Sequence, residues 1–217
     1  MMLSGLLLAS APSLAAEPDA AAVEADWILD KLARPAPMRT AFVELRESRL
    51  LKNPLRLSGE YRRPTDDVLV REVRAPYAET TTIRAGEATI ARAGKSPRTF
   101  SLSRAPELAG LQGGFGALLS GDRDQLAEHY EVAADGTRRQ WILTLVPKQA
   151  ELATQVRDIV LYGRGAELRC IETRPATPAG QPAADVQRTL LAGAARAADA
   201  VVDADALAAL CHAPTAQ

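Results

Sequence analysis

Histidine is scarce in this sequence, and the 217 residues contain two, His129 and His212. The two cysteines are Cys170 and Cys211. His129 lies in a predicted strand, and His212 directly follows Cys211, whereas a nucleophile and its base must converge in one pocket. Two histidines and two cysteines at these spacings fit no zinc-binding pattern. We therefore expect no catalytic residues, no metal and no cofactor, and a protein that is not an enzyme.

Phosphate-binding and nucleic-acid-binding signals are also missing. The glycine-rich stretch 112–116 does not join a strand to a helix and has no Lys-Ser or Lys-Thr ending, so we interpret it as a hinge. The chain has 26 basic and 27 acidic residues and a formal net charge of −1, which provides no basic face for nucleic acid. Aromatic residues make up only 4% of the chain.

The hydrophobic runs are too short to cross a membrane. The run at 3–11 has the length of a signal-peptide core, and Ser13 and Ala15 place small residues at the −3 and −1 positions of a cleavage site. We predict a signal peptide over 1–15, one domain over 16–217 and a periplasmic location in a Gram-negative cell. A packed N-terminal apolar helix is the alternative. In an oxidising compartment, Cys170 and Cys211 are expected to form a disulfide, with two buried thiols as the alternative.

The hydrophobic period changes early in the chain. Apolar residues recur at helical spacing over 19–32, and Pro35 ends this helix. Alternation then predicts strands at regular spacing, which is typical of an up-and-down antiparallel sheet or barrel. The glycine-punctuated segment 105–127 predicts short helices, and 203–210 a last helix. The expected strands are 40–51, 55–62, 68–73, 78–84, 88–92, 98–102, 129–133, 140–146, 155–162, 167–172 and 185–191.

A sheet of this size curls, and its concave face must be filled by side chains, by a helix or by a ligand. The middle segment is either a lid over this face or a permanently packed core helix. Alternating apolar positions place a set of side chains on the concave face, although a slip of one residue would reverse a strand. The predicted hydrophobic cargo cavity consists of Leu57, Tyr61, Val70, Ile83, Ile90, Phe100, Phe115, Leu118, Trp141, Leu143 and Leu145.

Several short motifs occur in a recognisable order. They read AFVE at 41–44, GEYRRP at 59–64, VRAP at 73–76, a turn at Gly86, YEV at 130–132 and LTLVPK at 143–148. Their order and spacing across 38–172 resemble those in the periplasmic outer-membrane lipoprotein carriers of the LolA type. The sequence resembles a divergent branch of that family.

The resemblance implies a mainly β fold with α (α+β), in which a curved antiparallel sheet forms an incomplete β-barrel closed by short helices. It also implies that Arg63 is a lid latch that donates to carbonyls in 108–119. The implied function is that of a periplasmic carrier or chaperone for an acylated lipoprotein or other lipid-linked cargo. Such a protein works as a monomer between an inner-membrane donor and an outer-membrane acceptor, without stable membrane insertion. An envelope sensor or interaction domain that binds a lipid or lipoprotein is the alternative, followed by an enzyme on the same fold.

Overall fold

The computed structural model describes residues 22–46, 55–102, 117–118, 120–177, 180, 186–199, 201 and 203–212. The predicted signal peptide, the start of the first predicted helix and most of the segment 105–127 lie outside these residues. The helices are α1 (Ala25–Leu32), α3 (Arg123–His129), α4 (Ala150–Ala153), α5 (Ala192–Ala198) and α6 (Ala204–His212). The strands are β1 (Met38–Arg46), β2 (Leu55–Thr65), β3 (Val68–Ala75), β4 (Glu79–Arg84), β5 (Glu87–Arg92), β6 (Arg98–Ser101), β7 (Tyr130–Gly136), β8 (Trp141–Pro147), β9 (Val156–Arg164), β10 (Glu167–Pro175) and β11 (Gln187–Leu191).

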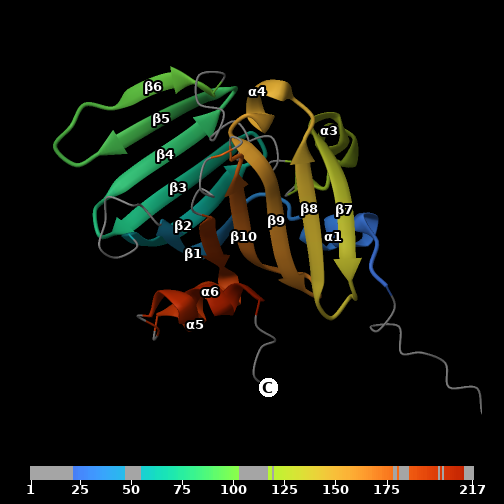
Figure 1. The fold of residues 1–217 in the computed structure, drawn as a ribbon. Helices are drawn as coiled ribbons and strands as arrows, with labels where there is room; N and C mark the ends of the chain where they lie inside the picture. The colour runs from blue at the N-terminus through green and yellow to red at the C-terminus, as the bar shows by residue number, and fades with distance from the viewer. Residues whose placement is uncertain are drawn as a thin grey trace, which may run out of the picture.

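All these strands form one sheet, in the order β6-β5-β4-β3-β2-β1-β11-β10-β9-β8-β7 (Figure 1). Two meanders, β1 to β6 and β7 to β11, meet where β1 pairs antiparallel with β11. Strands β6 and β7 are the two edges, so the sheet is curled but not closed. The predicted fold class, a mostly antiparallel β protein with a few helices, is confirmed.

A tight turn fixes the register between β4 and β5 of the first meander. Ala85 and Gly86 connect β4 to β5 with φ values of 49° and 77°, and Arg84 pairs with Glu87 across the turn. Two consecutive positive φ angles are the signature of the two-residue hairpin loop whose twist matches that of the strands. Register matters here because it decides which side chains share a face.

One face of the sheet, called the inner face below, packs against α1. This helix buries Ile28, Leu29 and Leu32 and contacts β7, β8 and β10. Helix α3 adds the fully buried Leu126 to the same apolar cluster. In the described part of the chain, the cover of the inner face therefore comes from the helices that precede β1 and β7.

The opposite, outer face packs against α5 and α6. Val43, Leu45 and Leu190 of the sheet form an apolar cluster with alanines of α5 and with Leu207 of α6. The structure pairs Cys170 of β10 with Cys211 of α6 in a disulfide, with a Cα–Cα distance of 5.2 Å. This is the pair expected from the sequence, and it attaches the C-terminal helix to the sheet.

Several elements differ from the sequence-based expectation. His129 ends α3 and the strand begins at Tyr130, one residue later than predicted. The short helix α4 was not predicted. Helix α5 was not predicted either, because its sequence AGAARAA contains no large apolar residue to mark a helical period.

Candidate functional site

The inner face carries a continuous apolar cluster drawn from both meanders. Six of the predicted cavity residues belong to it, and all six are buried: Leu57, Tyr61, Leu118, Trp141, Leu143 and Leu145. The pairing of Leu143 with Leu161 and of Phe42 with Leu191 continues the same face across the sheet. Register thus places the predicted residues of β2 and β8 on one face, and their role as the lining of a cargo cavity stays a prediction.

Three other predicted residues lie on the inner face but away from this cluster. Ile83 and Phe100 pack with Ala88 and Leu102 in a smaller cluster near the β6 edge. Ile90 is half-buried and stands opposite Thr81, which is also an inner-face residue. Leu69 contacts both clusters and connects them.

The prediction for Val70 was wrong. Val70 pairs with Thr82 and with Arg62, which places it on the outer face. The inner-face positions of β3 are Leu69, Arg71 and Val73. Over 68–73 each phase of β3 contains two apolar residues and one charged residue, so alternation does not distinguish the two faces and the prediction was one residue out of register. Phe115 lies outside the described residues.

Sequence reasoning also missed part of the cluster. Phe42, Leu161, Ile171 and Leu191 are buried on the inner face. Their strands carry apolar residues on both faces. In β10 and β11, for example, Cys170 pairs with Leu190 on the outer face, and the adjacent Ile171 pairs with Thr189 on the inner face. In such strands, the alternation of apolar and polar residues does not show which residues face inward. The strand register in the structure is needed to assign them to the inner face.

Trp141 is fixed at the β8 end of the cluster. Its indole Nε1–H donates to the carbonyl oxygen of Gly165 at 2.9 Å, and the side chain is fully buried. The ring lies over Gly163, where any Cβ atom would overlap it. A buried indole with a satisfied N–H is rigidly held, so Trp141 is a defined spectroscopic probe of this face.

Arg63 also points to the inner face, opposite Met38 of β1, and it is 5% exposed. Its Nη1 donates to the carbonyl oxygen of Arg34 at 2.8 Å, just beyond α1. Its Nη2 donates to the carbonyl oxygen of Asp66 at 3.3 Å and pairs with the Asp66 carboxylate at 2.9 Å. The guanidinium of Arg63 thus contacts the backbone just after the C-terminal end of α1. Of the carbonyl acceptors expected in 108–119, all but those of 117 and 118 lie outside the described residues.

A row of charged side chains adjoins the apolar cluster on the inner face of the first meander. Glu44 of β1 is 1% exposed and pairs with Arg46 and with Arg71 of β3. Arg71 also approaches Glu79 of β4, and Glu79 pairs with Arg92 of β5. The sequence analysis did not identify this row, because its members belong to four different strands.

Burial shapes the titration of this row. It raises the pKa of Tyr61 to about 12, because the phenolate would lose its hydration, although the Arg71 charge acts in the opposite direction. Burial also disfavours the charge of Arg71, but Glu44 and Tyr61 outweigh it and the pKa of Arg71 is raised. Arg71 therefore remains a cation inside the sheet.

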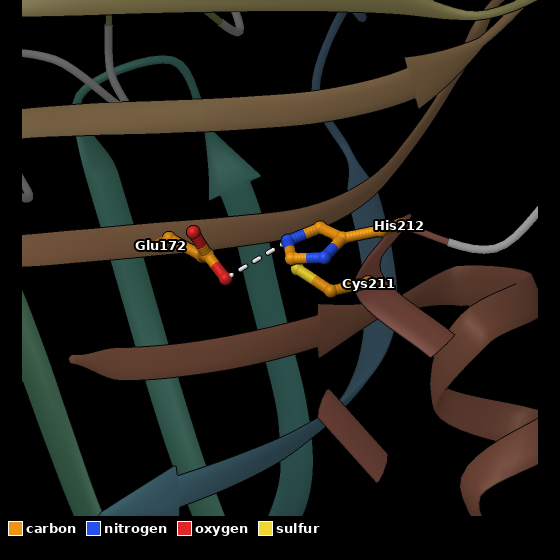
Figure 2. Close-up of side chains that lie close together, drawn as sticks. All are labelled: Glu172, Cys211 and His212. Atoms are coloured by element: carbon orange, nitrogen blue, oxygen red, sulfur yellow. Dashed lines mark hydrogen bonds and ion pairs between the residues drawn. The ribbon is translucent and has the colours of Figure 1, made fainter. Parts of the chain in front are cut away.

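A second polar cluster lies on the outer face, where Glu172, Cys211 and His212 converge (Figure 2). The buried Glu172 accepts from Arg188 at 2.8 Å, from Arg174 at 3.0 Å and from Tyr162 at 3.2 Å, and its Oε1 lies 3.1 Å from His212 Nε2. Burial disfavours its carboxylate, but the arginine hydrogen bonds prevail and its pKa is lowered.

This outer cluster fits a structural tie better than a metal site. The Cys211 sulfur is bonded to Cys170, and a disulfide sulfur is not the thiolate that binds zinc. Glu172 and His212 alone fall short of the three or four protein ligands of zinc sites. The cluster instead anchors the end of α6 to β10.

Comparison with known proteins identifies the family. The sequence model of the family described as outer membrane lipoprotein carrier protein LolA-like matches residues 15–214. The chain belongs to this LolA-like family. A crystal structure of a LolA superfamily protein from Nitrosomonas europaea is similar over 78% of this chain and 92% of that chain, with 12% identity and a TM-score of 0.41. No curated protein matches the chain significantly.

The LolA-like assignment covers both meanders and the C-terminal helices that hold the disulfide. Among the described residues, no helix of this LolA-like protein is long and apolar enough to cross a membrane. Among the described residues, the apolar cluster, Arg63 and the charged row lie together on the inner face of one sheet.

Proposed function

We propose that this protein is a periplasmic carrier or chaperone that binds an acylated lipoprotein or other lipid-linked cargo on its inner face. Its residues 1–15 serve as a signal peptide, and residues 16–217 form one domain that works as a monomer. It takes cargo from an inner-membrane donor and passes it to an outer-membrane acceptor, and it binds its cargo without transforming it. Membership of the LolA-like family supports this proposal.

The observation that carries the proposal is the composition of the inner face. Apolar side chains from β1, β2, β8, β9, β10 and β11 meet there, and their cover comes from helices rather than from a second sheet. The edge strands β6 and β7 are not paired with each other. The β6 and β7 edges can therefore move apart while β1 and β11 stay paired, whereas a closed barrel would have to break backbone hydrogen bonds to open.

The energetics of acyl-chain burial fit a carrier. Each buried methylene contributes about 0.8 kcal/mol, so a palmitoyl-length chain gives on the order of 10 kcal/mol before the costs of ordering. Displacing the helices from the inner face opposes this gain. Cargo would thus bind tightly and still be released to an acceptor with a more favourable site.

Trp141 provides the test. In a Trp27→Phe variant, Trp141 is the sole tryptophan, so its fluorescence reports on the inner face alone. Titration with fatty acyl chains brominated along their length should quench this fluorescence saturably, at one chain-binding site per protein. Unbrominated chains of the same length should compete. Absence of saturable quenching with fatty acyl, lipopeptide and polyene probes alike would rule out the carrier function.

A further inference from the structure

The charged row on the inner face alternates in sign across the first meander. It runs Arg46, Glu44, Arg71, Glu79, Arg92, on strands β1, β3, β4 and β5. Register places all of them on one face: Glu44 stands opposite Leu57, Arg71 opposite Tyr61, and Glu79 opposite both Val73 and Arg92. The row is therefore continuous with the apolar cluster, to which Leu57, Tyr61 and Val73 belong.

The centre of the row is buried and its two ends are open. The side chains of Glu44, Arg71 and Glu79 are 1%, 11% and 9% exposed, whereas those of Arg46 and Arg92 are 46% and 49% exposed. Three arginines face two carboxylates, which leaves one net positive charge on a largely apolar face. Buried ion pairs add little to stability compared with apolar residues of the same size, so packing alone gives no reason for this row.

The guanidinium of Arg71 is held by Glu44, Tyr61 and Phe42, with which it makes an ion pair, a side-chain hydrogen bond and a ring contact. Its Nη2 donates to Glu44 Oε2 at 2.7 Å, and its plane lies over the Phe42 ring with 4.8 Å between the guanidinium carbon and the ring centroid. Its Nη1 lies 3.9 Å from Glu79 Oε1, which is beyond hydrogen-bond distance. A guanidinium offers a planar fork that matches the oxygens of a phosphate or carboxylate, and here one arm of the fork contacts its neighbour only loosely.

Each carboxylate of the row has a second arginine. Glu44 pairs with Arg46, and Glu79 Oε2 accepts from Arg92 Nε at 2.5 Å. If Arg71 turned to another anion, Glu79 would keep Arg92 and Glu44 would keep Arg46. The exchange would leave no buried carboxylate without a partner, which is the costly outcome when buried ion pairs are broken.

We propose that Arg71 binds the anionic group, a phosphate or a carboxylate, of an amphiphilic cargo whose acyl chain lies on the apolar cluster beside it. This inference rests on the proposed carrier function and specifies its cargo class: an anionic amphiphile rather than a neutral acylated molecule. In the empty protein, Glu44 and Phe42 aim the guanidinium along the face, and the loose contact with Glu79 is the one that the ligand replaces.

The test compares three amphiphiles with the same chain length and different head groups: dodecanoate, dodecyl phosphate and dodecyl maltoside. Their affinities for the mature protein are measured below their micelle concentrations by competition with an acyl-chain fluorophore. We expect at least one anionic probe to bind about tenfold or more tightly than the maltoside, as a charge-assisted bidentate contact implies. A preference for dodecyl phosphate identifies a phosphate head group, and a preference for dodecanoate identifies a carboxylate.

Variants of Arg71 separate charge from fork geometry. Arg71→Gln should reduce the affinity for the anionic probe to that for the maltoside, while maltoside affinity stays within about twofold because the apolar cluster is unchanged. Arg71→Lys keeps the charge, and it should retain only part of the preference because the fork is lost. Arg62→Gln is the matched control, since Arg62 pairs with Glu72 on the outer face at 3.1 Å, and it should behave as wild type.

The possible results separate this inference from the carrier function. If the wild type binds the three probes equally, or if Arg71→Lys keeps the full anionic preference, the assignment of Arg71 is refuted while the carrier function stands. If none of the probes binds the wild type, both proposals fail. If Arg71→Gln does not fold, as judged by its thermal transition, Arg71→Lys alone decides the matter.

Discussion

Arg63→Leu is the substitution that most directly probes how the inner face is covered. In the folded protein, Arg63 donates to the backbone carbonyls of Arg34 and Asp66 and pairs with the Asp66 carboxylate. The Asp66 side chain is 78% exposed, so this pair contributes about 1 kcal/mol or less. The two carbonyl contacts contribute about 1–1.5 kcal/mol each. Removing the guanidinium should therefore cost about 2–4 kcal/mol in total.

The part of this cost that falls on α1 is that of the Arg34 carbonyl contact, about 1–1.5 kcal/mol, because Arg34 follows that helix by two residues whereas Asp66 lies between β2 and β3. Loosening the end of α1 makes its separation from β8 and β10 easier. A decrease of about 1–1.5 kcal/mol in the local opening free energy corresponds to amide exchange that is about 5- to 13-fold faster. Hydrogen exchange monitored by mass spectrometry should show this acceleration in peptides covering 25–34. Binding of an acyl probe should become faster, and exchange in β9 and β10 should change much less.

The neighbouring residue supplies the control. Arg62 lies on the outer face, half-exposed and paired with Glu72, so Arg62→Leu should change α1 exchange by less than about threefold. Equal α1 exchange in the Arg62→Leu and Arg63→Leu variants would show that Arg63 does not restrain the helix.

Four further predictions concern stability. Replacing both cysteines with serine opens a loop with a sequence separation of 41 residues and should lower the unfolding free energy by roughly 4 kcal/mol in chemical denaturation; an unchanged midpoint would contradict the structural disulfide. Leu143→Ala removes a fully buried inner-face side chain and should cost about 2–5 kcal/mol, whereas the exposed Val146→Ala should cost under about 1 kcal/mol. The pKa of Tyr61 is raised to about 12, so the folded protein disfavours its phenolate. The free energy of unfolding should therefore fall as the pH rises from 10 to about 12, and the Tyr61→Phe variant should lack the Tyr61 contribution to this fall. In an ultraviolet titration of the folded protein, Tyr61 should be the last tyrosine to ionise. The pKa of Glu172 is lowered by its arginine partners, so its contribution is present at neutral pH and is lost on acidification below the ordinary glutamate range; Glu172→Gln should flatten the acid limb of the stability profile.

The sequence predicted those parts of the fold that depend on local signals. In β2, apolar and polar residues alternate on a strand with one solvated face, and the phase of Leu57 and Tyr61 was correct. Two-residue turns such as Ala85-Gly86 also mark strand ends locally. The count of two cysteines in a chain that we predict to be exported was enough to expect a disulfide, because an oxidising compartment favours pairing.

Features that depend on long-range register could not be predicted. Strand β3 has apolar residues at both phases, with Arg71 in one and Glu72 in the other, so alternation gave no basis for choosing Leu69 and Val73 over Val70 as inner-face residues. The pairing of Glu44 with Arg71 spans 27 residues of sequence and exists only because β1 and β3 flank β2 in the sheet. Helix α5 lacks large apolar residues, yet its small side chains permit close packing of Ala194, Ala195 and Ala198 on the outer face.

Photocrosslinking tests most directly whether the inner face binds an acyl chain. The mature protein is incubated with a palmitate analogue that has a photoreactive group along its chain, irradiated and digested, and the labelled peptides are sequenced by mass spectrometry. Binding on the inner face predicts labelling of peptides that contain Leu57 and Tyr61 of β2 and Trp141 to Leu145 of β8, and this labelling should decrease with excess palmitate. Inner-face binding would be contradicted if labelling were confined to outer-face residues such as Val43, Leu190 and Leu207. It would also be contradicted if excess palmitate did not reduce the labelling.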